Sequence, residues 1–304
     1  MTTTATRPRG AASAGPLKPM ILTKLMLAGR RAPLHTTPAA VGLEYEDVRF
    51  TSVDGLDLRG WFIPSGLSAP GPVVVFIHGW LWNRLGNVGG QVPLADKDVE
   101  FLPATRALHA AGYHVLLFDL RNHGESARKV PVTYGPNEAL DYRGALAYLR
   151  SRGDVDPARI GALGCSMGAN TALYGTPEDQ PVKAILAIQP AIVPHFNRNF
   201  ALDTFGRMGP AMLKPVDPIY RLLRAPLLKD HDPSVPARRL GATVVQYVQG
   251  TGDQWGEMAD VEAMSAVTPS SLGVIHYASG GRYEGYRYVN EEVADVAGFF
   301  VSNL

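Results

Sequence analysis

A serine between two glycines is the first feature of this sequence that could do chemistry. Gly164, Ser166 and Gly168 form a G-x-S-x-G pattern, preceded by a strand-forming stretch and followed by a helix-forming one. This context is typical of a nucleophilic serine on a sharp strand-to-helix turn, where the flanking residues must be small. At a helix N-terminus the helix dipole also favours developing negative charge. We therefore predict that Ser166 is a nucleophile, in preference to a serine that lies between two glycines by chance.

Asp253 is the acidic residue best placed to assist such a serine. It lies just past residues 242–248, which are predicted to form a parallel strand, and ligands of open parallel sheets bind at the carboxyl ends of strands. The alternative is a turn aspartate that accepts hydrogen bonds from its own backbone. The GTG at residues 250–252 follows the same strand, but the third glycine of a dinucleotide-binding fingerprint is displaced to Gly256, so we reject that interpretation.

Four more segments match, in order, the motifs of one superfamily. They are VVVFIHGW, FDLRNHGES, TYGPNEALD and VQGTGDQWG, at residues 73–80, 118–126, 133–141 and 248–256. Together with the serine motif, they make the chain resemble the α/β-hydrolase superfamily of serine esterases and peptidases over residues 43–304. The resemblance implies an α/β-hydrolase fold with Ser166 as nucleophile and Asp253 as the acid of a catalytic triad. It also implies an oxyanion hole formed by the backbone N–H groups of Trp80 and Met167.

The histidine of the triad is missing from its expected place after the last predicted strand. Relatives typically have G-G-H-Y there, whereas this chain has GGRY, with Arg282 in the position of the histidine. Arginine stays protonated and has no lone pair, so Arg282 cannot act as the general base that activates Ser166. By the resemblance, Arg282 lies beside Asp253, where a guanidinium and a carboxylate favour a bidentate ion pair.

Three other histidines are candidates for the missing base. His195 is the best of them because it follows closely on the end of a predicted parallel strand, and His231 lies in the same long segment. His276 lies in the last predicted strand, about six residues from the expected position, which is up to roughly 20 Å of extended chain. For each, the alternative is an ordinary packed or solvated histidine. By the resemblance, His78 and His123 hold loops through hydrogen bonds.

Strands alternate with helices along most of the chain. Residues 43–52 and 56–63 predict an antiparallel hairpin, and the β-branched run at 72–78 is typical of a strand buried on both faces. Similar runs occupy residues 114–120, 159–164, 182–188, 242–248 and 271–277, and an amphipathic helix is expected at 291–300. This alternation predicts an α/β fold with a mostly parallel, doubly wound sheet and an N-terminal hairpin.

The segment at about 190–240 is too long for a simple connection. It is rich in proline and carries large apolar side chains at Phe196, Phe200, Phe205, Met208 and Met212. Because it follows a parallel strand, it leaves the sheet at the carboxyl edge, where ligands bind. We expect a partly helical cap, inserted into the domain over Ser166 and contributing some of these side chains to a pocket. The alternative is an insertion that packs on the sheet away from the site.

The N-terminal region and the overall composition limit the classes of partner. We expect residues 1–19, which are small, polar and Pro/Gly-punctuated, to form a mobile tail, and residues 20–42 to form a helix and linker. Lys24 interrupts the only apolar run there, which argues against a secretory signal or a membrane span. A formal net charge of +1 gives no electrostatic reason to expect nucleic acid or a membrane as partner. The single cysteine, Cys165, excludes an internal disulfide, and we expect a cytoplasmic protein.

The sequence has no metal-binding motif and no phosphate-binding loop, so no cofactor is expected, and the predicted partner is a small-molecule substrate. The favoured function is hydrolysis of a small, largely apolar ester, amide or thioester by a serine hydrolase with a degenerate or rewired triad. One alternative is a cyclase, lyase or isomerase on the same fold, in which Arg282 binds a substrate carboxylate. Another is a ligand-binding protein without catalysis, because a fold does not fix a function.

Overall fold

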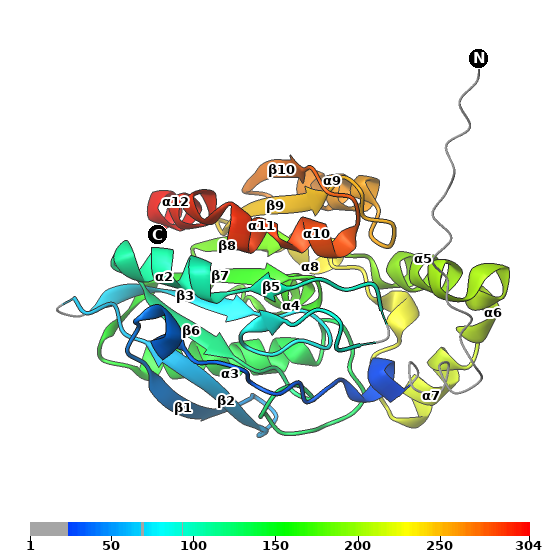
Figure 1. The fold of residues 1–304 in the computed structure, drawn as a ribbon, viewed down its shortest axis with the longest axis horizontal. Helices are drawn as coiled ribbons and strands as arrows, with labels where there is room; N and C mark the ends of the chain where they lie inside the picture. Colours follow the sequence, from blue (N-terminus) through cyan, green and yellow to red (C-terminus); the bar gives the residue numbers. More distant parts are fainter. Residues whose placement is uncertain (1–23, 68–69, 93) are drawn as a thin grey trace, which may run out of the picture.

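One sheet of eight strands carries the fold. The structure is a computed structural model that describes residues 24–67, 70–92 and 94–304. The strands lie in the order β1-β2-β6-β3-β7-β8-β9-β10 (Figure 1). Their bounds are β1 (Glu46–Thr51), β2 (Asp57–Ile63), β3 (Gly71–Ile77), β6 (His114–Phe118), β7 (Val155–Cys165), β8 (Ala184–Ile188), β9 (Val244–Gly250) and β10 (Ser271–Tyr277). A separate two-stranded sheet pairs β4 (Gly86–Asn87) with β5 (Val99–Glu100).

Strand pairing changes from antiparallel to parallel along the sheet. β1 and β2 form an antiparallel hairpin, and β2 also runs antiparallel to β6. From β6 through β3, β7, β8 and β9 to β10, every neighbouring pair is parallel. All residues of β3, β6 and β8 are buried, as expected for strands covered on both faces. The mostly parallel sheet with an N-terminal hairpin, predicted from the sequence, is confirmed.

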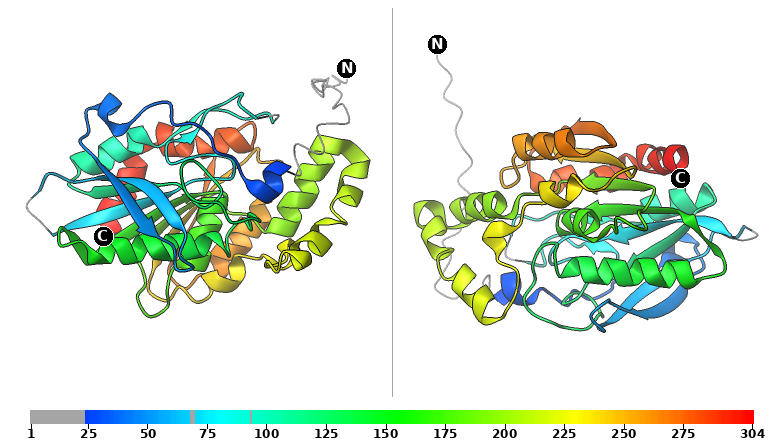
Figure 2. Two further views of the ribbon diagram at one scale, coloured as in Figure 1. Left: turned by 90° about the horizontal axis from the view of Figure 1, so that it is seen from below. Right: turned by 180° about the vertical axis from the view of Figure 1, so that it is seen from behind.

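Helices cover both faces of this sheet (Figure 2). Because successive side chains of a strand point to opposite faces, Val73, Val75 and Ile77 of β3 pack in one apolar cluster with α3, α4 and α9, whereas Val74 and Phe76 pack in another with α2, α11 and α12. The helices are α2 (Leu102–Ala110), α3 (Glu138–Ser151), α4 (Met167–Gly175), α9 (Met258–Val267), α10 (Arg282–Tyr286), α11 (Tyr288–Glu291) and α12 (Val293–Asn303), with a 3-10 turn η1 (Pro38–Val41) before β1.

The segment between β8 and β9 consists of short helices at one end of the sheet (Figures 1 and 2). They are α5 (Val193–Phe205), η2 (Gly206–Met208), α6 (Gly209–Met212), α7 (Val216–Leu222), η3 (Leu228–Asp230) and α8 (Ser234–Ala237). Phe200 of α5 is buried against the core. Phe205 and Met212 line a separate apolar cavity among α5, α6 and α7, and Met208 is 71% exposed. Four of the five predicted lining side chains therefore lie against the core, in this separate cavity or in solvent.

The described part of the N-terminal region packs against the sheet domain. Residues 24–28 are helical, and Leu25 and Leu27 are partly buried against the core. The indole Nε1 of Trp80 donates to the backbone oxygen of Leu25 at 3.2 Å. The predicted tail at residues 1–19 lies outside the described residues. Among the helices that the structure describes, none has the length and apolar character needed to cross a membrane.

A buried ion-pair network holds the loop after β6 to helix α3. Arg121 donates from Nε and Nη2 to Oδ1 of Asp141 at 3.0 and 2.8 Å, and from Nη2 to Oδ1 of Asp54 at 2.6 Å. Lys129 reaches the same Asp54 from the surface at 2.8 Å. The side chains of Arg121 and Asp141 are 1% and 0% exposed. Asp54 would still pair with Arg121 if Asp141 were removed, whereas removal of Arg121 would leave Asp141 buried without a counter-charge, which is strongly unfavourable.

We predict that Arg121→Met lowers the free energy of unfolding by about 3–5 kcal/mol, because Asp141 then stays buried without a counter-charge. Urea unfolding followed by circular dichroism measures this change. Arg49→Met is the matched control, since Arg49 forms an exposed ion pair with Asp57, and its expected cost is below about 1 kcal/mol. Similar losses of stability in the two variants would contradict the prediction.

Candidate active site

Ser166 lies on the strand-to-helix turn between β7 and α4. Its backbone has φ 53° and ψ −116°, a conformation that residues with a side chain rarely adopt. Its N–H donates to the oxygen of Ile188 at 2.9 Å. A Cβ atom on Gly164 would lie 2.5 Å from the oxygen of Gly168, and one on Gly168 would lie 1.9 Å from the oxygen of Ile77. Both flanking positions therefore require glycine, for the steric reason predicted from the sequence.

A small cavity of about 30 Å³ adjoins Ser166. Its wall is mostly aromatic or apolar, and the described residues that line it are Trp80, Trp82, Tyr134, Ser166, Met167, Asn170, Ala191, Val193, Phe196, Trp255, Arg282, Tyr283 and Tyr286. Of the five cap side chains considered from the sequence, Phe196 is the one in this set. Arg282 is the one charged residue among the described lining residues.

Arg282 joins the predicted nucleophile to the predicted acid. Its Nη1 forms an ion pair with Oδ2 of Asp253, and its Nη2 donates to Oγ of Ser166 at 3.1 Å and to the backbone oxygen of Gln189 at 2.9 Å. The side chains of Arg282 and Asp253 are 3% and 0% exposed. The ion pair predicted from the sequence is therefore present, but it uses one oxygen of Asp253 because the second Nη points to Ser166.

Asp253 is saturated with hydrogen bonds. Its Oδ1 accepts the backbone N–H groups of Trp255 and Gly256 at 2.9 and 3.0 Å, so the aspartate also closes a turn of its own loop. Its Oδ2 accepts from Nε2 of Gln249 at 3.0 Å in addition to Arg282. Burial lowers the pKa of Arg282, but the Asp253 carboxylate and Tyr286 together raise it by more, so the net shift of the pKa is upward. The guanidinium therefore stays charged beside Ser166.

Two aromatic rings flank the guanidinium. Cζ of Arg282 lies 4.8 Å from the ring centre of Phe196 and 5.2 Å from that of Tyr286, within the range of cation–π contacts. Phe196 comes from α5 and Tyr286 from α10, so the two helices enclose the cation together. Burial raises the pKa of Tyr286, which keeps its hydroxyl protonated. Tyr286 is therefore not a base for Ser166 at neutral pH.

The two residues expected to supply the oxyanion hole line the same cavity. Met167 is the first residue of α4, and Trp80 follows the end of β3. Among the described residues, neither backbone N–H has a hydrogen-bond partner. Nε2 of His78 accepts the N–H of Leu120 at 3.0 Å, and its Nδ1 lies 2.8 Å from the oxygen of Gly79, which holds the turn before Trp80. The assignment of these two N–H groups to an oxyanion hole stays a prediction.

The other candidate bases lie elsewhere. Nδ1 of His195 is 2.8 Å from Oδ2 of Asp260 on a half-exposed surface, and Nε2 of His276 is 3.2 Å from Oε1 of Glu262, also half-exposed. His231 is buried, and neither of its ring nitrogens has a partner among the described residues. No histidine belongs to the described lining of the Ser166 cavity. Replacement of the missing base by His195, the strongest of these sequence-based candidates, finds no support in this geometry.

Gln189 is a site residue that the sequence analysis missed. It follows β8 directly, its backbone oxygen accepts from Arg282, and its Nε2 donates back to the backbone oxygen of Arg282 at 2.7 Å. Its Oε1 accepts the N–H of Gly250 at 3.3 Å, so one side chain connects the ends of β8 and β9 to α10. The available signal was its place just after a predicted parallel strand, the same signal that identified Asp253.

Residues 74–294, which include Ser166, Asp253 and Arg282, match a family model described as the alpha/beta hydrolase family. The chain belongs to this family. Three solved structures with the same fold agree. The esterase Pf2001 of Pyrococcus furiosus superposes with a TM-score of 0.69 at 22% identity, covering 90% of this chain and 98% of that one. An acetyl xylan esterase from Paenibacillus sp. R4 has a TM-score of 0.63 at 20% identity over 95% of each chain.

The third structure is the α/β-hydrolase GrgF from Penicillium sp. sh18, with a TM-score of 0.61 at 18% identity, covering 86% of this chain and 99% of that one. Because these sequence identities are low, the three structures support the assignment of the fold alone. The α/β-hydrolase fold predicted from the sequence is confirmed by the family match and by these superpositions.

Curated relatives match over shorter stretches. The thiohydrolase aneE of Aspergillus aculeatus is 31% identical over 165 residues, which is 54% of this chain and 47% of that protein. The polyketide transferase ATR5 of Stachybotrys chlorohalonatus is 30% identical over 187 residues, or 60% of this chain and 55% of that protein. An uncharacterized protein, YfhR of Salmonella typhimurium, is 35% identical over 140 residues, or 45% and 41%. The chain thus spans about half the length of the curated relatives it matches.

The strained backbone at Ser166 leads to a stability prediction. We expect Ser166→Gly to unfold with a free energy about 1 kcal/mol higher than Ser166→Ala, because glycine adopts a positive φ without strain whereas alanine keeps the Cβ. Both variants lack the hydroxyl that accepts from Arg282, so the comparison isolates the backbone term. Parallel urea titrations measure the difference, and an alanine variant as stable as the glycine variant would show that the turn is not strained.

Proposed function

We propose that this chain is a serine hydrolase-type protein that binds a small, largely apolar ester, amide or thioester and turns it over slowly. In this proposal Ser166 is the nucleophile, the N–H groups of Trp80 and Met167 bind the carbonyl oxygen, and Asp253 fixes Arg282. The observation that carries it is the contact between Arg282 and Ser166, because a cation takes the place that a general base needs.

The chemistry of acyl transfer explains why turnover should be slow. When Ser166 attacks a carbonyl carbon, a bond forms from Oγ to that carbon and the Oγ proton must move to an acceptor. Arg282 directs an N–H at Oγ and has no lone pair, so the proton has to leave to water. Loss of one triad member costs roughly four to six orders of magnitude in turnover, and what remains comes from the oxyanion hole and binding.

The cation also has a favourable effect. A guanidinium 3.1 Å from Oγ stabilises negative charge on Ser166 and on an oxyanion formed nearby. This electrostatic term supports residual reactivity with good leaving groups, such as p-nitrophenol or a thiol, whose departure needs no proton. The thiohydrolase and esterases among the similar proteins favour the same substrate classes.

The dimensions and lining of the cavity support a small substrate. A cavity of about 30 Å³ holds roughly two water-sized groups, and the walls include Trp80, Phe196 and Trp255. An acetyl group, with one methyl and one carbonyl, is close to this size, whereas longer acyl chains exceed it. We therefore propose that the substrates carry short acyl groups.

A second function is favoured by the same arginine. Arg282 is a fixed cation at the nucleophile, so a substrate carboxylate could replace Ser166 as its hydrogen-bond acceptor. The protein would then bind an anion, either as a non-hydrolytic enzyme or as a binding protein, with Ser166 unreactive. A fluorophosphonate probe separates this anion-binding function from the hydrolase function, because it labels a reactive serine and leaves an unreactive one unmodified.

We predict that Arg282→His increases p-nitrophenyl acetate turnover by roughly 10²-fold, because Asp253 can orient an imidazole that accepts the Ser166 proton. The gain should be partial, since the site is packed around a guanidinium. The measurement is initial rate against enzyme concentration at pH 8, with fluorophosphonate labelling of the same samples.

Two controls make this result interpretable. Ser166→Ala gives the background rate, and Arg282→His combined with Ser166→Ala should return to that background. Arg282→Gln removes the cation without providing a general base, because an amide oxygen is too weakly basic to take the Ser166 proton, so its turnover should not rise. Fast Ser166-dependent turnover by the unmodified protein would show that another residue already acts as base, and it would overturn this account of Arg282.

A further inference from the structure

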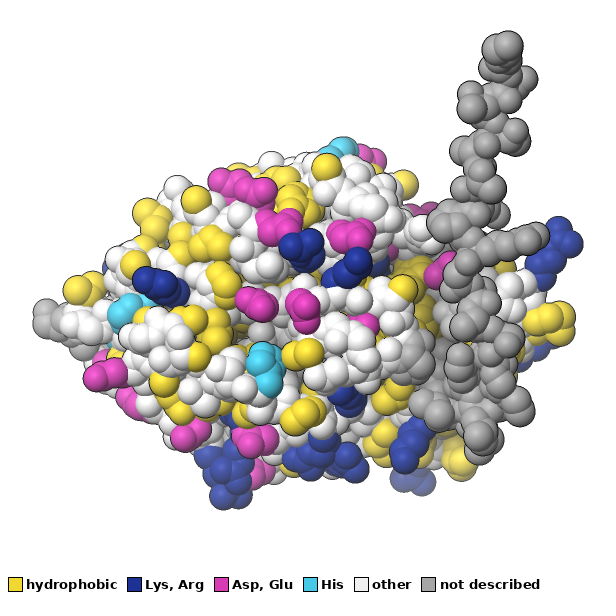
Figure 3. Space-filling view, in the orientation of Figure 1, with side chains coloured by type: hydrophobic (Ala, Val, Ile, Leu, Met, Phe, Trp, Pro, Cys, Tyr) yellow, Lys and Arg dark blue, Asp and Glu magenta, His cyan; other side chains and the backbone are white. Residues whose placement is uncertain are grey.

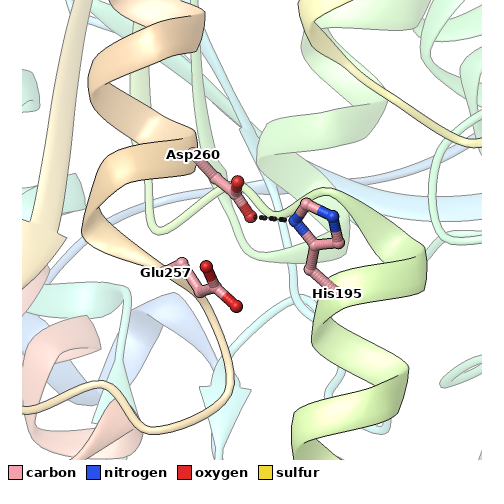
Figure 4. Close-up of side chains that lie close together, drawn as sticks. All are labelled: His195, Glu257 and Asp260. Carbon is pink, nitrogen blue, oxygen red and sulfur yellow. Dashed lines mark hydrogen bonds and ion pairs between the residues drawn. The ribbon is translucent and has the colours of Figure 1, made fainter.

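A cluster of three metal-binding side chains lies outside the Ser166 cavity (Figure 4). His195 projects from α5, whereas Glu257 is the residue just before α9 and Asp260 lies in the first turn of α9. Nδ1 of His195 is 2.8 Å from Oδ2 of Asp260, and one donor atom from each of the three residues lies within 4.8 Å of the others. His195 and Asp260 are 65 positions apart in the sequence, so no spacing motif could reveal the cluster.

The charge around this cluster favours a cation. Within the described residues, no ion pair joins Glu257 or Asp260 to a lysine or arginine. Glu257 accepts one hydrogen bond, from Nδ2 of Asn199 at 3.0 Å, and keeps further lone pairs free. Asp232 adds another negative charge in the neighbourhood of Asp260. His195, when protonated, supplies at most one positive charge against these carboxylates.

The geometry points to a binding site for a divalent transition-metal ion, with Zn²⁺ as the best match, formed by His195, Glu257 and Asp260. One imidazole nitrogen and two carboxylate oxygens form a ligand set that Zn²⁺ accepts, with water in the fourth position. Ca²⁺ and Mg²⁺ prefer all-oxygen sets, so a histidine ligand selects against them. Rotation of the exposed His195 and Glu257 side chains would bring all three donors to a single ion.

The site would connect the inserted helices to the loop that holds Asp253. The neighbour of His195 in α5, Phe196, lies over Arg282 and packs edge-on against Trp255 at 5.9 Å. Trp255 and Asp253 belong to the loop that leads into Glu257 and α9. An ion shared by α5 and α9 would therefore hold Phe196 over the Ser166 cavity. None of the three ligands lines that cavity, so the ion would position the cap and take no part in the chemistry.

Isothermal titration calorimetry of the full chain without a histidine tag tests this proposal directly. Zn²⁺ should bind to one site per chain, and His195→Ala and Glu257→Gln should each weaken binding by about tenfold or more. Both side chains are exposed, so both variants should keep the fold, which circular dichroism checks. His276→Ala is the matched control: His276 forms a comparably exposed pair with Glu262, outside the three-ligand group, and its loss should leave binding unchanged.

The outcomes decide separately on the site and on its role. Absence of saturable Zn²⁺ binding, or equal affinity of His195→Ala and the unmodified chain, would overturn the site. Limited trypsin digestion reports on the cap, because Arg207 lies exposed in η2. Slower cleavage after Arg207 with Zn²⁺ in the unmodified chain, and no such effect in His195→Ala, supports the link between α5 and α9. Binding without protection would overturn that link. Neither measurement depends on Ser166 reactivity.

Discussion

The site around Ser166 depends on one buried ion pair, between Arg282 and Asp253. Removing two charges from water is costly, and the attraction between them offsets that cost only when their remaining donors and acceptors are also paired. Here they are: Arg282 donates to Asp253, Ser166 and Gln189, and Asp253 accepts from two backbone N–H groups, Gln249 and Arg282. The pair therefore connects the carboxyl ends of several strands, and it helps to fix the positions of Ser166, Gln189 and Gln249, which contact it.

The sheet topology explains why these residues meet although they are far apart in the sequence. Strands β7, β8, β9 and β10 are parallel neighbours, so their carboxyl ends lie along one edge. Ser166, Gln189 and Asp253 each follow one of the first three strands, and Arg282 begins α10 soon after the fourth. The apolar clusters on both faces hold the strands in register, and the strained turn at Ser166 is maintained by that packing.

Much of this arrangement could be predicted from the sequence, because local rules determine it. Buried β-branched runs indicated the strands, and the glycines around Ser166 indicated a turn whose close contacts the structure displays. The contact of Arg282 with Ser166 could not be predicted from the sequence. Nη1 of Arg282 pairs with Asp253, and the contact depends on which acceptors in the folded chain lie near Nη2. The direction of the cap side chains was equally inaccessible: Phe196 reaches the cavity and Met208 is exposed, although both are large apolar residues of one segment.

Under the proposed function, the same ion pair makes the site rigid at the expense of its reactivity. A charged guanidinium holds Asp253 more firmly than a neutral imidazole could, because the interaction is charge-assisted, and its length lets it reach Ser166 and Gln189 together. An imidazole could accept a proton but would satisfy fewer of these partners and fill less of the space between Phe196 and Tyr286. Under the proposed function, arginine at this position leaves the Ser166 turn and Asp253 well packed but lacks the lone pair that rapid acyl transfer requires.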